Sequence, residues 1–284
     1  MTRNLSLGGD LIELVSVGTQ QPGAMAVAER GSLALDVARG AVSGVKSVNK
    51  FGKAPSGIQT TATDVWSRAD ATPTQQIWLA PKTAIPHIIA SSSAADTAGS
   101  TGAGTVIYWG LRDWNTAETS GTMALGGTTP AYAIIHRIKA LGQATTTSIG
   151  VNAGTITATT TGQAGGETVT AVILPNEGQT EMAIYGVPST QDFYMTRWAC
   201  AMAKEVTTQA VQFALRVNEN PDVQTLGYTL KNDMYVVSSG ASSANFDFVN
   251  PPKYSGPCII KVQGVASTAD VDAKAAFDGY LVTK

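Results

Sequence analysis

The chain has 284 residues, a formal net charge of −2 and no cluster of Lys or Arg, so binding to nucleic acid through phosphate neutralisation is not supported. Its densest basic stretch holds only Lys46, Lys50 and Lys53. Apolar content of 43% allows a sizeable core, whereas charged content is only 14%, against about 25% in typical soluble proteins. Low charge suits a surface covered by neighbouring subunits, because charges are depleted at the cores of interfaces. A secreted or β-rich protein with this composition is the plainer alternative.

The N-terminal segment, residues 1–32, is irregular in pattern, with one short strand expected at Leu11–Val17. Such a segment ahead of a β body could be an extended arm that lies on a neighbouring subunit, and a disordered terminus is the alternative. Arg3, Asp10 and Glu13 interrupt it, which argues against a signal peptide. No apolar run in the chain approaches the roughly 18 residues of a membrane span. We therefore expect a chain that is made in the cytoplasm and has no membrane partner.

The next segment, Leu33–Val48, fits either an extended or a helical pattern. Gly40 and Gly44 disfavour a helix, because glycine costs about 1 kcal/mol there relative to alanine. Extended structure is therefore predicted. Asn49–Thr63, with its glycines and proline, reads as a loop.

The remainder of the chain alternates short apolar runs with turns rich in Gly, Pro, Asn and Ser. In Thr208–Val217, the clearest run, Val211, Phe213, Leu215 and Val217 fall on one face, as in a strand that is half buried in a sheet. Further strands are expected at Gln75–Ala80, Ile85–Ala90, Thr105–Leu111, Ser120–Leu125, Tyr132–Ala140, Thr155–Thr160, Thr168–Leu174, Glu181–Val187, Asp192–Ala203, Gln224–Leu230, Met234–Val237, Asn245–Val249, Cys258–Val262 and Ala276–Val282.

Many short strands joined by turns predict an all-β protein, specifically a β-sandwich of jelly-roll type. No internal repeat occurs at a fixed period, which counts against a propeller or a solenoid. The expected organisation is an arm and connecting segment over residues 1–50, followed by the β-sandwich body over residues 51–284.

Few residues suggest catalysis. His87 and His136, the only histidines, lie in apolar strands, where a hydrogen-bonded core histidine is the default. The chain has no G-x-S-x-G elbow, H-E-x-x-H helix or phosphate-binding loop. Cys200 and Cys258 lie in apolar runs and are expected to be buried thiols rather than a disulfide or a metal pair.

Two further features were weighed as possible sites. Asp270 and Asp272 are spaced as at the start of a calcium loop, but the glycine and the bidentate glutamate are missing, so a solvated loop is expected. Aromatic side chains could stack on sugars, and Trp66 and Trp114 lie in turn-like contexts that would expose them. The other tryptophans, Trp78, Trp109 and Trp198, are assigned to core packing. We predict no catalytic, cofactor-binding or metal-binding residue and no enzymatic activity.

Several longer stretches, taken in order, resemble a family of virion structural proteins from tailed bacteriophages that are common in aquatic environments. The similarity runs from about Arg39 to the C-terminus, and the stretches that carry it are Thr63–Pro81 (TDVWSRADATPTQQIWLAP), Gly102–Trp114 (GAGTVIYWGLRDW), Gly126–Lys139 (GGTTPAYAIIHRIK), Val151–Thr157 (VNAGTIT), Gly178–Thr190 (GQTEMAIYGVPST) and Phe277–Tyr280 (FDGY). The resemblance implies a non-enzymatic particle component, located in the virion after assembly in the host cytoplasm.

The first expectation is a capsid decoration or cement protein, a homotrimer that bridges subunits of the major capsid protein. Its exposed edge strands would be covered by neighbours rather than protected by lysines. The alternatives are a tail, neck or fibre-adaptor component, and a module that binds a host glycan or receptor. An enzyme is the last alternative.

Overall fold

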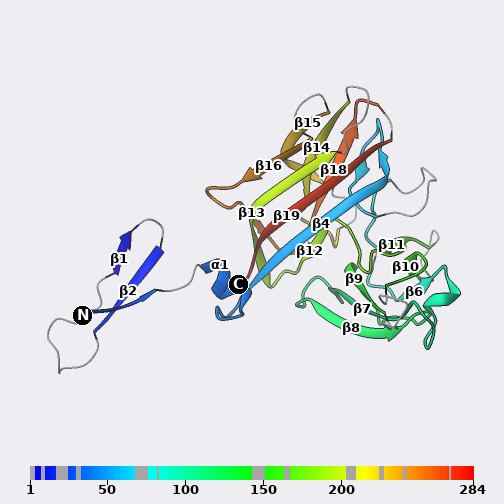
Figure 1. Ribbon diagram of the computed structural model, residues 1–284, viewed down its shortest axis with the longest axis horizontal. Coiled ribbons are helices and arrows are strands. Elements are labelled where there is room, and N and C mark those ends of the chain that lie inside the picture. Colours follow the sequence, from blue (N-terminus) through cyan, green and yellow to red (C-terminus); the bar gives the residue numbers. More distant parts are fainter. Residues whose placement is uncertain are drawn as a thin grey trace. The chain divides into compact units, whose positions relative to one another are not determined.

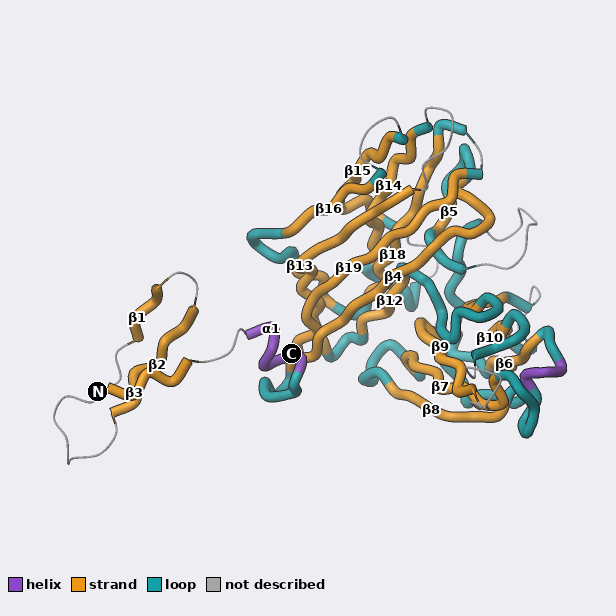
Figure 2. Tube along the Cα trace, in the orientation of Figure 1, coloured by secondary structure: helices purple, strands orange, loops and turns teal. Residues whose placement is uncertain are grey.

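The computed structural model describes residues 4–7, 10–16, 25–29, 33–67, 76–81, 83–142, 151–162, 167–202, 209–223, 227–238, 242–268 and 270–284 (Figure 1). The chain divides into two compact units, Met1–Ser47 and Val48–Lys284. Strands account for 58% of the structure, and among the described residues helix is confined to α1 (Leu33–Ala38) and the 3-10 turn η2 (Ala94–Asp96), so the all-β prediction is confirmed (Figure 2). Within the described residues, no helix has the length and apolarity needed to span a membrane.

The first unit contains a small antiparallel sheet in the order β1 (Asn4–Leu7), β2 (Asp10–Ser16) and β3 (Met25–Glu29). The strand expected at Leu11–Val17 is therefore present as β2. The register sets Leu5 opposite Ile12 and Leu14 opposite Val27. The segment expected to be an N-terminal arm therefore contains backbone pairing of its own, in β1 to β3, and its role as an arm on a neighbouring subunit stays a prediction.

The extended structure expected from Leu33 onward is also wrong at its start, because Leu33–Ala38 is the helix α1. Gly40 does not interrupt this helix. It follows the last turn with a φ of +73°, and its N–H donates to the carbonyl of Val37. Glycine adopts this left-handed conformation without the steric cost that other residues bear, so here it ends a helix.

The loop expected over Asn49–Thr63 is largely a strand, because β4 runs from Val45 to Ile58. Gly52, taken from sequence as a loop residue, is a point of close backbone approach. A Cβ atom at Gly52 would lie 2.4 Å from the amide nitrogen of Ala183 and 2.5 Å from the carbonyl oxygen of Val65. Glycine inside a strand often marks such an approach, and the sequence alone does not distinguish this role from a turn.

Four sheets build the second unit. Sheet I has the order β16 (Ser243–Asp247), β13 (Gln191–Met202), β19 (Val271–Thr283) and β4, with β17 (Lys253–Ser255) also paired to β13. Sheet II has the order β12 (Ile184–Val187), β18 (Cys258–Ala266), β14 (Ala210–Asn218) and β15 (Thr229–Val237), with β5 (Thr63–Asp64) also paired to β18. Sheet III is β8 (Thr119–Ala124), β7 (Ala103–Leu111) and β9 (Ile134–Gly142). Sheet IV is β11 (Val169–Ile173), β10 (Ile156–Thr160) and β6 (His87–Ser91).

These four sheets are arranged as a propeller-like ring. The lack of an internal repeat in the sequence had argued against a propeller. The strand order explains why no repeat exists. Sheets I and II have five strands each and sheets III and IV have three, and each sheet except III joins strands far apart in sequence, such as β4 with β19 and β6 with β10. A ring assembled from unequal, non-consecutive pieces leaves no fixed period.

Two apolar cores hold the unit together. Sheets I and II contribute most of the first, which includes Phe193, Trp198 and Phe213. Sheets III and IV contribute most of the second, together with Ile184 of β12 and Ile259 of β18. Strand β18 is therefore buried on both faces, which accounts for its nearly continuous apolar sequence.

Most expected strands are present within a few residues of their predicted bounds. Thr208–Val217 is confirmed as β14, and its four predicted inward residues are fully buried in the first core. The runs at Gln224–Leu230 and Met234–Val237 correspond to one strand, β15, and not two. The strand expected at Gln75–Ala80 is wrong over its described part, because residues 76–80 are irregular. The backbone N–H of Trp78 donates a hydrogen bond to the carboxylate of Asp64 at 2.7 Å, so a side chain and not a neighbouring strand satisfies this donor.

Candidate interaction site

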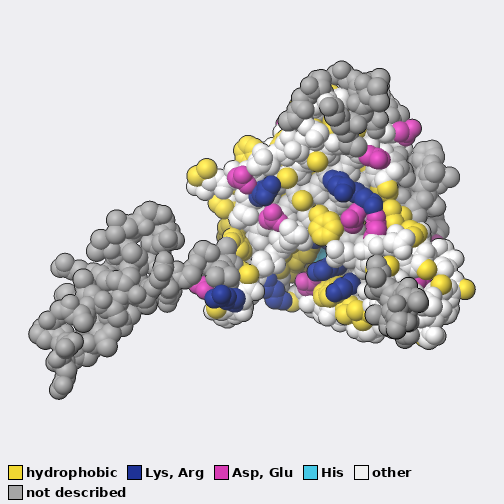
Figure 3. Space-filling view, in the orientation of Figure 1, with side chains coloured by type: hydrophobic (Ala, Val, Ile, Leu, Met, Phe, Trp, Pro, Cys, Tyr) yellow, Lys and Arg dark blue, Asp and Glu magenta, His cyan; other side chains and the backbone are white. Residues whose placement is uncertain are grey.

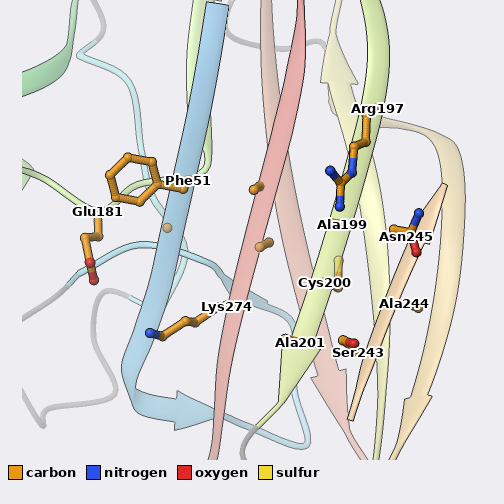
Figure 4. Close-up of a pocket in the computed structure, with 13 residues that line it drawn as sticks. Phe51, Glu181, Arg197, Ala199, Cys200, Ala201, Ser243, Ala244, Asn245 and Lys274 are labelled. Carbon is orange, nitrogen blue, oxygen red and sulfur yellow. The ribbon is translucent and has the colours of Figure 1, made fainter. Parts of the chain in front are cut away.

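A shallow groove of about 330 Å³ crosses the outer face of sheet I (Figure 4). Its floor is formed by the small side chains of Ala199, Ala201 and Ala276. Residues of the neighbouring strands and of one loop complete the lining: Phe51, Gly52, Glu181, Arg197, Cys200, Ser243, Ala244, Asn245, Lys274 and Ala275. An adjoining hollow of about 430 Å³ shares Ala201 and Lys274 with the groove and extends it towards β4.

Strand register produces the groove. Ala199 of β13 lies opposite Asn245 of β16 on one side and Ala276 of β19 on the other. Side chains of directly opposite residues lie on the same face of a sheet, so these residues form one row. Because two of them are alanine, the row is lower than the rows of longer side chains beside it, which contain Arg197 and Lys274.

The charges around the groove are unevenly paired. The guanidinium of Arg197 lies 3.6 Å from the carboxylate of Asp247, and Lys53 lies 3.4 Å from Glu181. Lys274 is exposed and makes no ion pair with any residue in the described part of the chain. Figure 3 shows this face with basic and acidic side chains scattered among apolar ones. The groove therefore has an apolar floor and an exposed ammonium, that of Lys274, in its lining.

A second surface lies on the outer face of sheet II. Leu230, Tyr235 and Val237 of β15 and Val265 of β18 are exposed, with 65% of Tyr235 accessible to solvent. The register places Tyr235 and Val265 on either side of Gln212, so they share a face. We call these four residues the β15 patch. Scattered apolar residues are ordinary on a surface, but three of these four lie on the edge strand β15, and an apolar group on an edge strand is a candidate contact surface.

Lysines lie on both of the edge strands β4 and β15. Lys50 of β4 donates to the carbonyl oxygen of His136 at 2.5 Å, and Lys53 pairs with Glu177 and Glu181. Lysines on an edge strand discourage pairing with other chains. Lys231 of β15 is exposed and pairs with Glu219, so both edge strands carry lysine, and β15 also exposes the apolar side chains of the β15 patch. The expectation that neighbouring subunits cover these edges stays a prediction.

A buried polar cluster lies where β4 meets β9 and β12. The imidazole of His136 is 2.7 Å from the carboxylate of Glu118 and stacks on the ring of Tyr185, with the ring centroids 4.5 Å apart. Burial lowers the pKa of Lys50 to about 7, with a further contribution from Arg137 and an opposing one from Glu118. His136 is thus the hydrogen-bonded core histidine that the sequence predicts. Lys50, His136 and Tyr185 are buried and line neither groove, so their arrangement suits packing rather than turnover of a substrate.

A buried ion pair lies within sheet II, between β18 and β5. The ammonium of Lys261 lies 2.7 Å from the carboxylate of Asp64, which also accepts a hydrogen bond from Gln263 at 3.1 Å. The ammonium also lies 4.1 Å from the ring centroid of Tyr228, a cation–π contact. Burial raises the pKa of Asp64, while the charge and hydrogen bond of Lys261 lower it. Sequence reasoning did not find this pair, although a lone lysine in the apolar run Cys258–Val262 is the kind of residue that needs a buried partner.

A second buried carboxylate, Asp96, holds a turn together. It accepts hydrogen bonds from the N–H groups of Ala103, Ala153 and Gly154 and from the hydroxyl of Ser91. Burial disfavours its charge, but these hydrogen bonds outweigh that effect and lower its pKa. Asp96 therefore joins η2 to the starts of β7 and β10 and has a structural role.

The imidazole of His87 is completely buried in sheet IV, and among the described residues neither of its nitrogens has a hydrogen-bond partner of normal geometry. Burial lowers its pKa to about 4, against a smaller opposing effect of the Ile85 backbone. The unfolded chain, with a histidine pKa near 6.5, then binds the proton more readily than the folded chain. Stability that is present above pH 6.5 is lost as the pH falls towards 4.

We therefore expect His87→Leu to remove part of the acid sensitivity of the protein. In urea titrations, the free energy of unfolding of the wild type should fall between pH 6.5 and pH 4.5 more than that of the variant. An equal fall in both proteins would show that His87 does not contribute. His136→Leu is the comparison, because burial lowers the pKa of His136 as well, so that variant should also lose acid sensitivity, and loss of its bond to Glu118 should in addition destabilise the protein at both pH values.

The tryptophans proposed for sugar stacking are not exposed together. Trp66, expected at the surface, is buried with 2% exposure, so that prediction is wrong. The sequence around Trp66 resembles a turn, but its backbone forms an isolated β-bridge with Met182 and its ring packs in the second core. Trp114 is half-buried against the same core. Trp78 and Trp198 are in the cores as predicted, whereas Trp109 is half-buried, with the guanidinium of Arg137 4.9 Å from its ring centroid.

The remaining residues singled out from sequence have plain roles. Cys200 and Cys258 are buried free thiols, as predicted. Asp270 adopts a φ of +65° and accepts a hydrogen bond from Gln59 at 2.7 Å. No cluster of three potential metal ligands occurs among the residues that the structure describes.

Comparison with protein-family models and with curated proteins finds no match to this chain. The virion role inferred from the sequence resemblance therefore stays a prediction.

Proposed function

We propose that this chain is a non-enzymatic structural protein of a tailed-bacteriophage virion, a capsid decoration protein that bridges capsid subunits. The observation that carries the proposal is the β15 patch, an apolar group on an edge strand of the second unit. A subunit embedded among copies would bury such a group, whereas a free monomer gains nothing from exposing it. A charged content of 14% points in the same direction.

The arrangement of ionisable groups also favours a structural role. Lys50, His136, Asp64 and Lys261 are enclosed by protein, where a substrate could not reach them. The groove on sheet I is accessible, but its floor consists of alanines. Such a floor provides contact area and shape, and the charged side chains of Glu181, Arg197 and Lys274 lie among the residues that line it.

Two finer features belong to the same proposal. Sheets I and II share the first core, which supports a β-sandwich of jelly-roll type within the ring. The first unit, compact in itself and joined through β4, would act as an attachment module on a neighbouring particle subunit. The glycan-binding alternative loses support because Trp66 is buried.

Copy number in purified particles tests the proposal. Particles of the phage that encodes the chain are digested, and its peptides are quantified against those of the major capsid protein. We expect a ratio near one, on the order of hundreds of copies, as symmetry-related contacts on a capsid lattice require. A few copies per particle would place the chain at the tail or neck instead, and its absence from purified virions would overturn the proposal.

A further inference from the structure

We infer that two copies of this chain associate head to tail, with the β15 patch of one copy seated in the sheet I groove of the next. The inference deepens the proposed function by identifying a contact between copies, and it rests on that function only for its biological setting. The two surfaces belong to different sheets of the same unit. A contact between them is heterologous, so repetition produces a closed ring or an open chain and not a two-fold dimer.

The sizes of the two surfaces match. The groove volume of about 330 Å³ is at the lower end of the range of roughly 300–1,000 Å³ typical of binding pockets. It suits one aromatic ring with a neighbouring aliphatic side chain, which Tyr235 and Val237 supply from alternate positions of β15. Tyr235 is 65% exposed and projects from an edge strand, so it can enter a groove without rearrangement of the core. The alanine floor leaves room for a ring where longer side chains would fill the space.

The polar groups around the two surfaces are complementary. Asp233 lies on the same face as Tyr235 and is exposed, and it accepts a hydrogen bond from Gln212 at 2.9 Å. It makes no ion pair within the described part of the chain, as is also true of Lys274 beside the groove. Ser243 and Asn245 at the groove rim offer hydrogen-bond partners to the phenol hydroxyl of Tyr235. Association would bring the exposed carboxylate of Asp233 to the exposed ammonium of Lys274 while burying the apolar patch.

Cross-linking of mixed variants tests the orientation. Val237→Cys and Asn245→Cys place one thiol on each surface and leave Tyr235 intact, and the native Cys200 and Cys258 are buried. With a short bis-maleimide, a mixture of the two variants should give a covalent dimer linked through positions 237 and 245, while either variant alone should not. A product from Val237→Cys alone would show that β15 edges pair with one another and would overturn the inference. Absence of any product from the mixture would overturn it as well.

The strength of association gives a second measurement. In sedimentation velocity over a concentration series, the wild type should form oligomers, and Tyr235→Ser should weaken their assembly at least tenfold. Ala199→Trp, which fills the groove, should have the same effect. Val249→Ser is the matched control, because Val249 is 95% exposed and lies outside both surfaces. A wild type that stays monomeric throughout, or a Val249→Ser variant as weak as Tyr235→Ser, would contradict the inference.

The two proposals fail separately. If the chain is abundant in virions but positions 237 and 245 do not cross-link, the structural role stands and the head-to-tail contact is wrong. If the contact forms in solution but the chain is absent from virions, the contact stands and the virion role is wrong.

Discussion

Replacing Lys261 with methionine is expected to lower the free energy of unfolding of the second unit by about 3–5 kcal/mol, because it leaves the buried carboxylate of Asp64 without its cation. Methionine retains most of the length of the lysine side chain, so the loss is mainly electrostatic. Asp64 would keep only the neutral donors of Gln263 and of the Trp78 backbone. Since Asp64 also holds Trp78 in the second core, we expect this variant to be among the most damaging single substitutions.

The double variant Asp64→Asn/Lys261→Met should recover most of the lost stability. It contains no buried charge. The asparagine oxygen can accept the hydrogen bond from the Trp78 backbone N–H, and its NH2 group can donate to the side-chain oxygen of Gln263 once the Gln263 amide is flipped. Urea denaturation of the full chain, followed by tryptophan fluorescence, measures all three free energies. Lys231→Met is the control, because its pair with Glu219 is partly exposed and such pairs contribute about 0–1 kcal/mol. A Lys261→Met variant no less stable than Lys231→Met would show that the buried pair makes no net contribution.

Replacing Lys50 with methionine is expected to stabilise the protein at neutral pH, the opposite direction to Lys261→Met. Lys50 is buried, and burial lowers its pKa from 10.5 to about 7. Below pH 7 both the folded and the unfolded chain carry the proton, and the folded chain bears the full cost of the enclosed ammonium. Between pH 7 and 10.5 the unfolded chain binds more protons, so stability rises with pH. At about 1.4 kcal/mol per pK unit, this shift sets an upper limit of roughly 5 kcal/mol.

Thermal denaturation over a pH series checks this expectation. The melting temperature of Lys50→Met should exceed that of the wild type at pH 6–7, and the difference should shrink as the pH approaches 10. Loss of the hydrogen bond from Lys50 to the carbonyl of His136 reduces the gain without changing its dependence on pH. Lys53→Met is the matched control on the same strand, and it should give no gain, because Lys53 is partly exposed and pairs with Glu177 and Glu181. A constant difference across the series would contradict the assignment.

Strand positions were the part of the fold most open to sequence reasoning. Apolar residues recur at every second position in Val211, Phe213, Leu215 and Val217. This pattern identified both the strand and its buried face, because successive side chains of a strand point to opposite faces of the sheet. Two predictions that used glycine as evidence against regular structure, at Gly40 against a helix and at Gly52 against a strand, were wrong. Gly40 ends a helix and Gly52 permits a close backbone contact, and these roles depend on neighbours that the local sequence does not specify.

The candidate site was less accessible from sequence than the strands. An exposed Tyr235 has the same alternating context as a buried aromatic, so only the position of β15 at the end of sheet II reveals it as surface. The groove needs three strands in register, β16, β13 and β19, to place small residues side by side. Lys261 and Asp64 are 197 residues apart, and their pairing follows from the register of β5 with β18.

By itself, the sequence determined that this is an all-β protein of low charge, with buried thiols and a hydrogen-bonded core histidine at position 136. These properties follow from composition and from short-range periodicity, which operate over a few residues. The tertiary structure alone decided which strands share a sheet, which edges stay apolar and exposed, and which charges are enclosed as pairs. Those outcomes depend on contacts between distant segments, whose free energy is set by the complete arrangement of strands and not by any local stretch.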